Sequence, residues 1–235
     1  MSAPALLLLP GLLCDAHLWA AQVAGLGQTA QCTVVDLTAG ETVEALARAT
    51  IAQAPPGPFA IAGLSMGGYV ALDVIRQAPA RVKGLALLDT NARPDAPEAT
   101  ADRRRMMALA ETDFDRVVSA LVPRLLSDAH RLDQTMVGTV RAMARSVGKA
   151  AYRRQQHAII ARPDSRPHLA RIACPTLVLC GAEDALTPLA VHEEMAAAIA
   201  GAELAVAPGS GHLTPLEAPR FVTDALSAWL GRLPA

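Results

Sequence analysis

The chain has 235 residues, which is enough for one domain or for one domain that carries an insertion. A hydrophobic fraction of 52% supplies a packed core and excludes a disordered protein, and because aromatic residues make up only 3%, that core is expected to be mostly aliphatic. The formal net charge of −1 argues against nucleic acid or an anionic membrane as a partner.

The apolar run near the N-terminus, "ALLLLPGLLCDA", is predicted to begin with a buried strand and not to be a secretion signal. No Lys or Arg precedes it, Pro10 and Gly11 interrupt it, and it contains no small-x-small cleavage site. A lipoprotein signal at Cys14 is disfavoured, because the bulky Leu13 stands directly before the cysteine. Since no apolar span is long enough for a membrane helix either, we expect a cytoplasmic protein.

Short apolar runs alternate with helix-length segments along the chain. The runs, each bounded by turn signals, are predicted to be strands at residues 5–10, 32–37, 59–64, 82–89, 175–181 and 202–208. They are rich in Val, Leu and Ile without alternation, which is typical of parallel strands buried on both faces. Helices are predicted between them at residues 17–27, 42–54, 67–78, 189–200 and 218–231. This order predicts an α/β fold with a doubly wound, mostly parallel sheet of about six strands.

Residues 93–167 break this alternation, because they hold only helical patterns between two loop-like stretches, "NARPDAP" and "ARPDSRP". We therefore expect a core formed by residues 1–92 and 168–235 that carries a helical cap, or lid, at 93–167. Residues 92–171 hold 15 of the 21 Lys and Arg but only 9 of the 22 Asp and Glu, so the cap is basic and the core acidic. Two interpretations stay open: the arginines bind a carboxylate-bearing substrate, or they only solvate the helix surfaces.

The pentapeptide "GLSMG", residues 63–67, follows a predicted strand and precedes a predicted helix, which is the setting of a nucleophile elbow. A serine in such a sharp turn takes strained dihedral angles, and residues two positions away must be small to avoid a clash with it. The turn exposes the hydroxyl of Ser65 at a helix N-terminus, where negative charge is stabilised. Ser65 is therefore a candidate nucleophile, although an ordinary Gly/Ser turn gives the same pattern.

Asp184 and His212 follow two later predicted strands, in the loops "CGAEDALTP" and "PGSGHLTP". A catalytic serine needs a base to accept its proton, and that base needs an acid to orient it. Because the carboxyl ends of parallel strands meet at one edge of a sheet, we expect Ser65, Asp184 and His212 to lie together there. Taken alone, Asp184 is an ordinary helix N-cap candidate and His212 a loop histidine.

Other polar residues near the strand ends are weaker candidates. Glu183, and Asp89 after the strand at 82–89, are alternatives to Asp184 as the orienting acid. His17, at the start of the first helix, is a candidate substrate contact. The remaining histidines are expected to be surface or cap residues: His130, His157, His168 and His192.

The cysteines show neither CxxC nor metal-ligand spacing and are expected to be free thiols, so no metal site is predicted: Cys14, Cys32, Cys174 and Cys180.

An acyl-transfer site also needs two hydrogen-bond donors for the oxyanion. We expect these to be the backbone N–H groups of Met66, directly after Ser65, and of Leu12, in the glycine-containing loop after the first strand. Because only their main chains donate, the side chains of Leu12 and Met66 are free to be apolar and are expected to face the acyl group. Both residues are therefore candidate substrate contacts as well.

Together these residues resemble the α/β-hydrolase fold superfamily over nearly the whole chain. The resemblance rests on the first strand with its loop (Pro10, Gly11, Trp19), on "GLSMGG", on "PTLVLCGAEDALTP" and on "GSGHLTPLEAP". With its helical cap the chain looks most like small bacterial carboxylic-ester hydrolases, including enol-lactonase-like and carboxylesterase-like members. This likeness implies a cofactor-free serine esterase that cleaves a small ester or lactone through an acyl-enzyme.

The resemblance also implies the roles of individual residues. Ser65 is carried over as the nucleophile, His212 as general base and acid, Asp184 as the acid that orients it, and Leu12 and Met66 as the oxyanion donors. Acyl transfer, lyase chemistry and cofactor-free peroxidation on the same scaffold stay open. A non-catalytic binding module is the remaining alternative, but such a protein would typically have lost one triad residue.

Two departures from the family pattern are visible. Pro10-Gly11 stands where many relatives have His-Gly, which changes the hydrogen bonding of the oxyanion loop but removes no triad member. The chain also begins almost directly at the strand before this loop, so the two leading strands of longer members are expected to be absent. The physiological substrate and the oligomeric state are not predicted.

Overall fold

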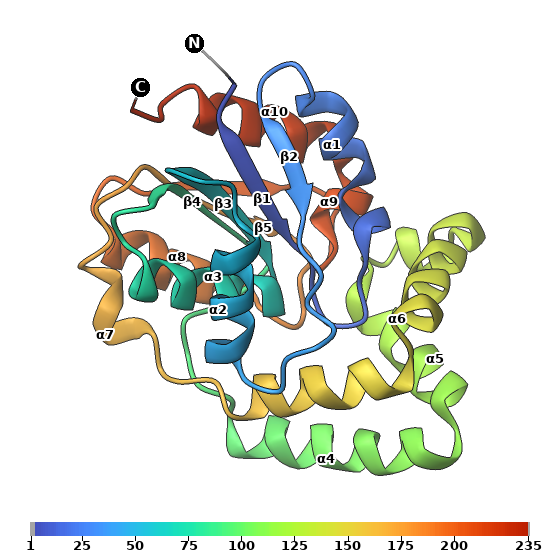
Figure 1. Cartoon of the computed structure of the whole chain (residues 1–235). Helices are drawn as coiled ribbons and strands as arrows, with labels where there is room; N and C mark the ends of the chain where they lie inside the picture. The colour runs from blue at the N-terminus through green and yellow to red at the C-terminus, as the bar shows by residue number, and fades with distance from the viewer. Residues whose placement is uncertain (1–2, 235) are drawn as a thin grey trace.

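The computed structural model describes residues 3–234, and a single sheet of six parallel strands runs through its centre (Figure 1). The spatial order is β2-β1-β3-β4-β5-β6, so the chain winds in one direction from β1 to β2 and in the other from β3 onward. The strands are β1 (Ala5–Leu9), β2 (Gln31–Val34), β3 (Phe59–Leu64), β4 (Val82–Leu88), β5 (Thr176–Gly181) and β6 (Glu203–Ala207). This confirms the predicted α/β fold with a doubly wound parallel sheet.

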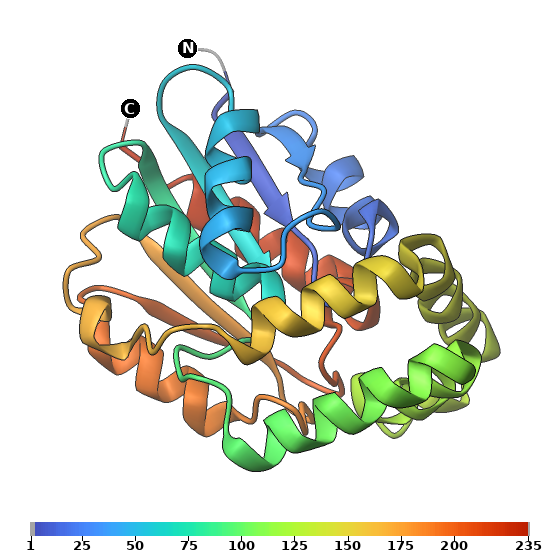
Figure 2. The same cartoon turned by 60° about the horizontal axis from the view of Figure 1, so that its bottom comes forward.

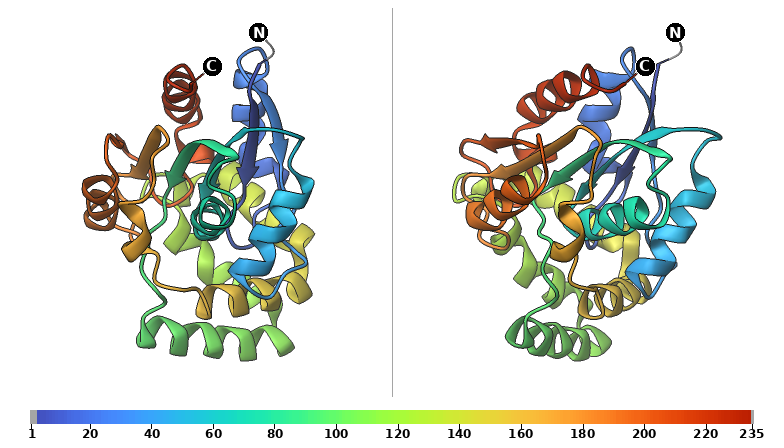
Figure 3. Two further views of the ribbon diagram at one scale, coloured as in Figure 1. Left: turned by 60° about the vertical axis from the view of Figure 1, so that its left-hand side comes forward. Right: turned by 90° about the vertical axis from the view of Figure 1, so that its left-hand side faces the viewer.

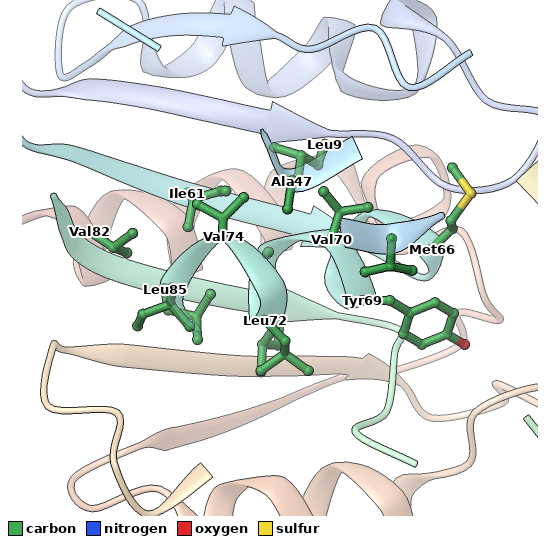
Figure 4. Close-up of a cluster of buried hydrophobic side chains, with 14 of the residues drawn as sticks. Leu9, Ala47, Ile61, Met66, Tyr69, Val70, Leu72, Val74, Val82 and Leu85 are labelled. Carbon is green, nitrogen blue, oxygen red and sulfur yellow. The ribbon is translucent and has the colours of Figure 1, made fainter. Parts of the chain in front are cut away.

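Helices cover both faces of the sheet because successive residues of each buried strand point to opposite sides. In β1, Leu7 and Leu9 pack with α2, α3 and α8, whereas Leu6 and Leu8 pack with α1 and α10. These helices are α1 (Ala20–Leu26), α2 (Val43–Gln53), α3 (Met66–Gln77), α8 (Leu189–Ala198) and α10 (Pro219–Leu230). Figure 4 shows the aliphatic packing of α3 on β1, β3 and β4, which is the kind of core that the composition predicted.

The predicted elements differ from the observed ones mainly at the edges of the sheet. The central strands β3 and β5 are buried along their whole length, but β2 and β6 are half exposed. Both are edge strands with a neighbour on one side only, so their apolar residues are not enclosed on both faces as the run of apolar letters suggested. The first predicted helix, 17–27, begins with the short helical turn η1 (Ala16–Trp19) before α1, and a short helix, α9 (Thr214–Glu217), precedes α10.

The segment between β4 and β5 is entirely helical and lies across the carboxyl ends of the strands (Figure 2). Its elements are α4 (Pro97–Thr112), α5 (Phe114–Leu125), η2 (His130–Leu132), α6 (Gln134–Ile160) and α7 (Arg166–Leu169). Helix α6 is interrupted at Gly148, whose φ of 78° is open to glycine but strained for other residues. Both chain ends lie on the opposite side of the molecule from α4 (Figure 3). The division into a core and a separate cap at 93–167 stays a prediction.

Most basic side chains of this helical segment pair with acidic residues of the same segment. Arg105 pairs with Asp102, Arg145 with Asp115, and Lys149 with Glu111. Within residues 3–234, every helix is too short or too polar to span a bilayer.

The enclosed centre of the sheet leads to a first prediction about stability. Leu179→Ala in β5 is expected to lower the free energy of unfolding by about 2–5 kcal/mol, because Leu179 is wholly buried and its loss leaves a cavity. Leu204→Ala in β6 is the matched control: Leu204 is 37% exposed, and the same change is expected to cost below about 1 kcal/mol. Urea unfolding measures both values, and equal losses would contradict this picture of the edge strand.

Candidate active site

Ser65 lies at the junction between β3 and α3, in a conformation that few residues adopt. Its φ of 53° and ψ of −115° fall outside the regions that L-residues favour. Neighbouring elements hold it in place: the Ser65 N–H donates to the Leu88 carbonyl of β4 at 2.9 Å, and the Thr90 hydroxyl donates to the Ser65 carbonyl at 2.8 Å. Hydrogen bonds from β4 and from the loop after it thus hold Ser65 in its strained conformation.

Two glycines make this turn possible by allowing backbones to meet. A Cβ at Gly63 would lie 2.3 Å from the Gly67 carbonyl oxygen, and a Cβ at Gly67 would lie 2.3 Å from the Leu9 carbonyl oxygen. Both distances are far inside van der Waals contact, and the atoms met belong to the main chain, which cannot rotate away. Glycine is therefore required at both positions for α3 to start this close to β1 and β3.

Ser65, His212 and Asp184 form one continuous line of hydrogen bonds at the carboxyl edge of the sheet. His212 Nε2 lies 2.9 Å from Ser65 Oγ, and His212 Nδ1 lies 2.8 Å from Asp184 Oδ2. Ser65, Asp184 and His212 come from the loops that follow β3, β5 and β6, respectively. Along the chain 119 residues separate Ser65 from Asp184, and 28 residues separate Asp184 from His212. The three residues that the sequence singled out are thus brought together.

The carboxylate of Asp184 is held by the loop in which it stands. The backbone N–H groups of Leu186 and Thr187 donate to Oδ1 at 2.8 and 3.0 Å, and the Thr187 hydroxyl donates to Oδ2 at 2.6 Å. Burial by itself raises the pKa of Asp184, but the charge of His212 and these donors hold that pKa below its usual value. Asp184 is therefore ionised and oriented toward His212.

His212 is almost fully enclosed, and its environment favours the protonated ring. Burial disfavours the imidazolium and by itself lowers the pKa of His212. The charge and the hydrogen bond of Asp184 outweigh this and raise the pKa above the ordinary value of 6.5. The backbone fixes the residue as well, since the His212 N–H donates to the Leu125 carbonyl of α5 at 3.0 Å.

The two alternative acids occupy different environments. Glu183 is exposed, and its carboxylate accepts the Asp128 N–H at 3.3 Å. Asp89 is wholly buried and accepts the N–H groups of Gly181 and Thr214 together with the Thr214 hydroxyl. Neither carboxylate contacts the His212 ring, whereas Asp184 does.

The two expected oxyanion donors come from different elements, Met66 from the start of α3 and Leu12 from the loop after β1. Among residues 3–234, neither the Met66 N–H, the first of α3, nor the Leu12 N–H has a hydrogen-bond partner. The next amide in the loop, Leu13 N–H, is already used: it donates to the Gln155 side chain of α6 at 3.0 Å. Within the described residues both N–H groups are therefore unpaired, and α6 braces the loop that carries Leu12.

A cavity of about 310 Å³ opens above Ser65 and is mostly apolar. Leu12, Leu13 and Val118 are among its lining residues, together with Ser65 and His212. The Met66 side chain is not in this lining, because it is wholly buried in the core that α3 forms with the sheet (Figure 4). Of the two side chains expected to face the acyl group, Leu12 lines the cavity and Met66 does not.

His17 lies away from the cavity. Its side chain is 75% exposed, and its ring contacts the Asp15 carboxylate, which also caps η1. Because this cap directs the ring into solvent, the structure does not place His17 among the residues that line the cavity.

His192 was expected to be a surface or cap residue, and this was wrong. Its side chain is wholly buried, and burial lowers its pKa to about 4, so the ring is neutral. Nε2 accepts the Thr90 N–H at 3.0 Å, and Nδ1 donates to the Pro188 carbonyl at 3.3 Å. His192 thus holds the loop whose Thr90 hydroxyl contacts Ser65. Its place in the helical pattern of α8 gave no sign that the ring is buried.

Glu217 is a structural residue of the site that the sequence reasoning missed. Its side chain is fully buried, and one carboxylate oxygen, Oε1, accepts the N–H groups of Gly211 and Leu213 at 3.0 and 3.2 Å. The other oxygen, Oε2, accepts the Ser127 N–H at 2.8 Å and contacts His130 Nδ1 at 3.0 Å. One carboxylate therefore joins the His212 loop to the helical segment. The acid in "GHLTPLEAP" was visible, but not its burial.

The cysteines and the acidic residues do not suggest a metal centre. All four cysteines are free, and the part of the chain that the structure describes contains no group of three or more His, Cys, Asp and Glu placed to hold a metal ion. The buried polar residues at the strand ends are used by hydrogen bonds within the site.

Comparison with known proteins connects this geometry to characterised relatives. Residues 6–225 match the alpha/beta hydrolase family. A thermophilic esterase from Thermogutta terrifontis, solved with malate bound, is 32% identical, superposes with a TM-score of 0.90, and the match covers 98% of this chain and 90% of that one. The enol-lactonase from Burkholderia xenovorans is 26% identical, with a TM-score of 0.89 over 99% of this chain and 93% of that one.

Curated proteins similar in sequence include esterases as well. A pimeloyl-[acyl-carrier protein] methyl ester esterase from Edwardsiella ictaluri is 28% identical over 94% of this chain and 91% of its own length. A bifunctional biotin biosynthesis protein from Cellvibrio japonicus is 24% identical over 96% of this chain, which spans only 47% of that longer protein.

The Glu217 carboxylate leads to a second prediction. Glu217→Gln is expected to lower the free energy of unfolding by about 2–4 kcal/mol, because one end of the amide presents N–H donors to backbone N–H groups that need an acceptor. Glu183→Gln, the same change at the exposed Glu183, is the control and is expected to stay within about 0.5 kcal/mol of wild type. A Glu217→Gln variant as stable as the control would show that these contacts contribute little.

Proposed function

The chain belongs to the alpha/beta hydrolase family and is an enzyme of the carboxylic-ester hydrolase class, and from this premise we propose that it cleaves a small ester or lactone through a Ser65–His212–Asp184 triad and an acyl-enzyme intermediate. The observation that carries the proposal is the unbroken line of hydrogen bonds from Asp184 through His212 to Ser65. The names of the relatives, an esterase, an enol-lactonase and a methyl ester esterase, support carboxylic esters, both open and cyclic, as the substrate class.

In the first step His212 Nε2 accepts the proton of Ser65 Oγ while Oγ attacks the ester carbonyl carbon. The C=O bond opens to an oxyanion, which the N–H groups of Leu12 and Met66 stabilise. The N-terminus of α3 adds the positive end of its dipole at the same point. His212 then gives its proton to the leaving alkoxide, and the acyl group stays bonded to Oγ.

In the second step water takes the place of the alcohol. His212 accepts a proton from this water as it attacks the acyl carbon, and the oxyanion forms again between the same two donors. Collapse breaks the bond to Oγ, which recovers its proton from His212, and the carboxylic acid leaves. Asp184 stays ionised throughout and stabilises the imidazolium that forms in each step.

The nucleophile leads to the third prediction. Ser65→Ala is expected to reduce kcat for p-nitrophenyl acetate by a factor on the order of 10⁴ to 10⁶, because no other group replaces Oγ. Ser119→Ala, at an exposed serine of α5, is the matched control and is expected to keep wild-type activity. A fluorophosphonate probe is expected to label the wild type and the control, but not Ser65→Ala. Full esterase activity in Ser65→Ala would overturn the proposal.

The pKa of His212 leads to the fourth prediction. Only neutral His212 accepts the Ser65 proton, so kcat/KM is expected to rise with pH through this pKa, with its midpoint above 6.5. Asp184→Asn removes the charge that stabilises the imidazolium, so it is expected to move this midpoint to lower pH and to reduce kcat by about 10⁴. Rates measured from about pH 5 to about pH 9 test both statements. A wild-type midpoint below 6.5, or one that Asp184→Asn leaves in place, would contradict them.

A further inference from the structure

Four arginines line the cavity above Ser65, and among residues 3–234 only one carboxylate, that of Asp95, lines it with them. Two of the arginines are half exposed and pair with acidic residues outside the cavity lining: Arg93 pairs with Glu194 at 2.8 Å, and Arg124 pairs at 3.3 Å with Asp102, which Arg105 also contacts. Their charges are balanced outside the cavity or by solvent. The other two, Arg103 and Arg162, are less exposed, at 25% and 6%, and their acidic partner lies in the cavity wall itself.

Arg103 and Arg162 share the single carboxylate of Asp95. Arg162 Nη1 donates to Asp95 Oδ1 at 2.7 Å, and Arg103 Nε donates to the same oxygen at 3.3 Å. The Asp95 side chain is 1% exposed and that of Arg162 is 6% exposed. Burial by itself raises the pKa of Asp95, but the charges of the two arginines and their hydrogen bonds keep it below its usual value. Two buried or half-buried positive charges thus face one negative charge.

The remaining hydrogen bonds of these guanidinium groups use neutral acceptors. Arg162 donates to the carbonyls of Arg93 and Ile159, and Arg103 Nη1 donates to the Gln156 side chain. Within residues 3–234, the Nη2 group of neither arginine has a hydrogen-bond partner. The Arg162 guanidinium also stacks on the Tyr69 ring at 4.3 Å, which fixes its plane.

We propose that Arg103 and Arg162 form a subsite for a free carboxylate of the substrate, so that the preferred substrate is a monoester of a dicarboxylic acid, or a lactone that carries a free carboxylate. This inference rests on the proposed esterase function, because it places the ester group at Ser65 in the same cavity. A positive charge that lacks a partner in a cavity wall with little access to water is unfavourable. An anion that pairs with it is correspondingly well bound. The planar Nη2 edges offer the donors that carboxylate oxygens accept.

The chemistry of the reaction is unchanged by this subsite. Water adds to the acyl carbon and the ester C–O bond breaks. From a monoester the alcohol leaves with a proton and the product is a dicarboxylic acid, whereas a lactone opens to a single hydroxy dicarboxylic acid. The subsite positions the acyl chain, so Arg103 and Arg162 are specificity-determining residues and take no part in proton transfer.

The test compares esters that differ only in charge at one end. Monomethyl esters of dicarboxylic acids with about four to eight carbons are compared with the dimethyl esters of the same acids, which are neutral and nearly equal in size. For at least one chain length, wild-type kcat/KM is expected to be about tenfold higher for the monoester. Ser65→Ala is included, so that any hydrolysis that does not need Ser65 counts against the proposed function and not against the subsite.

The variants separate the subsite from the general basic charge of the helices. Arg103→Gln is expected to lower the ratio of monoester to diester kcat/KM about tenfold, mainly through KM. Arg105→Gln, at a residue of the same helix that is 77% exposed and outside the cavity lining, is expected to keep the wild-type ratio. Arg162→Lys keeps the charge but loses the planar fork, and it is expected to lower the ratio with less loss of Tm than Arg162→Gln.

Three results would overturn the subsite while leaving the esterase proposal intact. One is a Ser65-dependent wild-type activity that shows no preference for any monoester. Another is an Arg103→Gln variant that loses activity on both esters equally, which would indicate a purely structural role. The third is an equal fall of the ratio in Arg103→Gln and Arg105→Gln, which would indicate only the net charge of α4.

Discussion

The positive φ of Ser65 is the constraint on which the arrangement of this molecule depends. A serine accepts this conformation only where its surroundings leave no alternative, and here they are the backbones of three elements: β1 meets Gly67, β4 accepts the Ser65 amide, and α3 begins at the next residue. The parallel sheet supplies this enclosure because its strand ends converge at one edge. The same convergence brings the loops after β5 and β6 into reach of the hydroxyl.

Buried carboxylates hold those loops in place. Asp184, Asp89 and Glu217 each accept two or more backbone N–H groups from turns at the strand ends. Such turns have no regular secondary structure to satisfy their amides, and an unpaired buried amide is costly. The side-chain oxygens of these acids are therefore used here as structural acceptors, and only Asp184 is also in contact with the His212 ring. The acidic balance of the core has a physical purpose in this arrangement.

The sequence predicted the parts of this structure that depend on local rules. The six strands follow from apolar runs bounded by turns, and Ser65, Asp184 and His212 from their places after three of them, which the fold then brings together. These local rules could not predict the burial of side chains that are covered by residues distant in the sequence. His192 has the helical spacing of a surface residue, yet the loop after β4 packs over it, and the Met66 side chain turns into the core instead of the cavity. The arginines in the sequence indicated that this segment is basic, but the sequence did not show which of them share Asp95.

Gln155 of α6 connects the helical segment to two loops of the sheet. From α6 its side chain accepts the Leu13 amide in the loop after β1 and donates to the Leu37 carbonyl after β2. The helical segment between β4 and β5 thus supports the backbone of the loop after β1, and Glu217 ties this segment to the His212 loop as well. For protein engineering this means that the insertion is not a detachable module. A helical segment grafted from a relative has to bring its own partners for both loops, or the grafted enzyme loses the geometry beneath the new pocket.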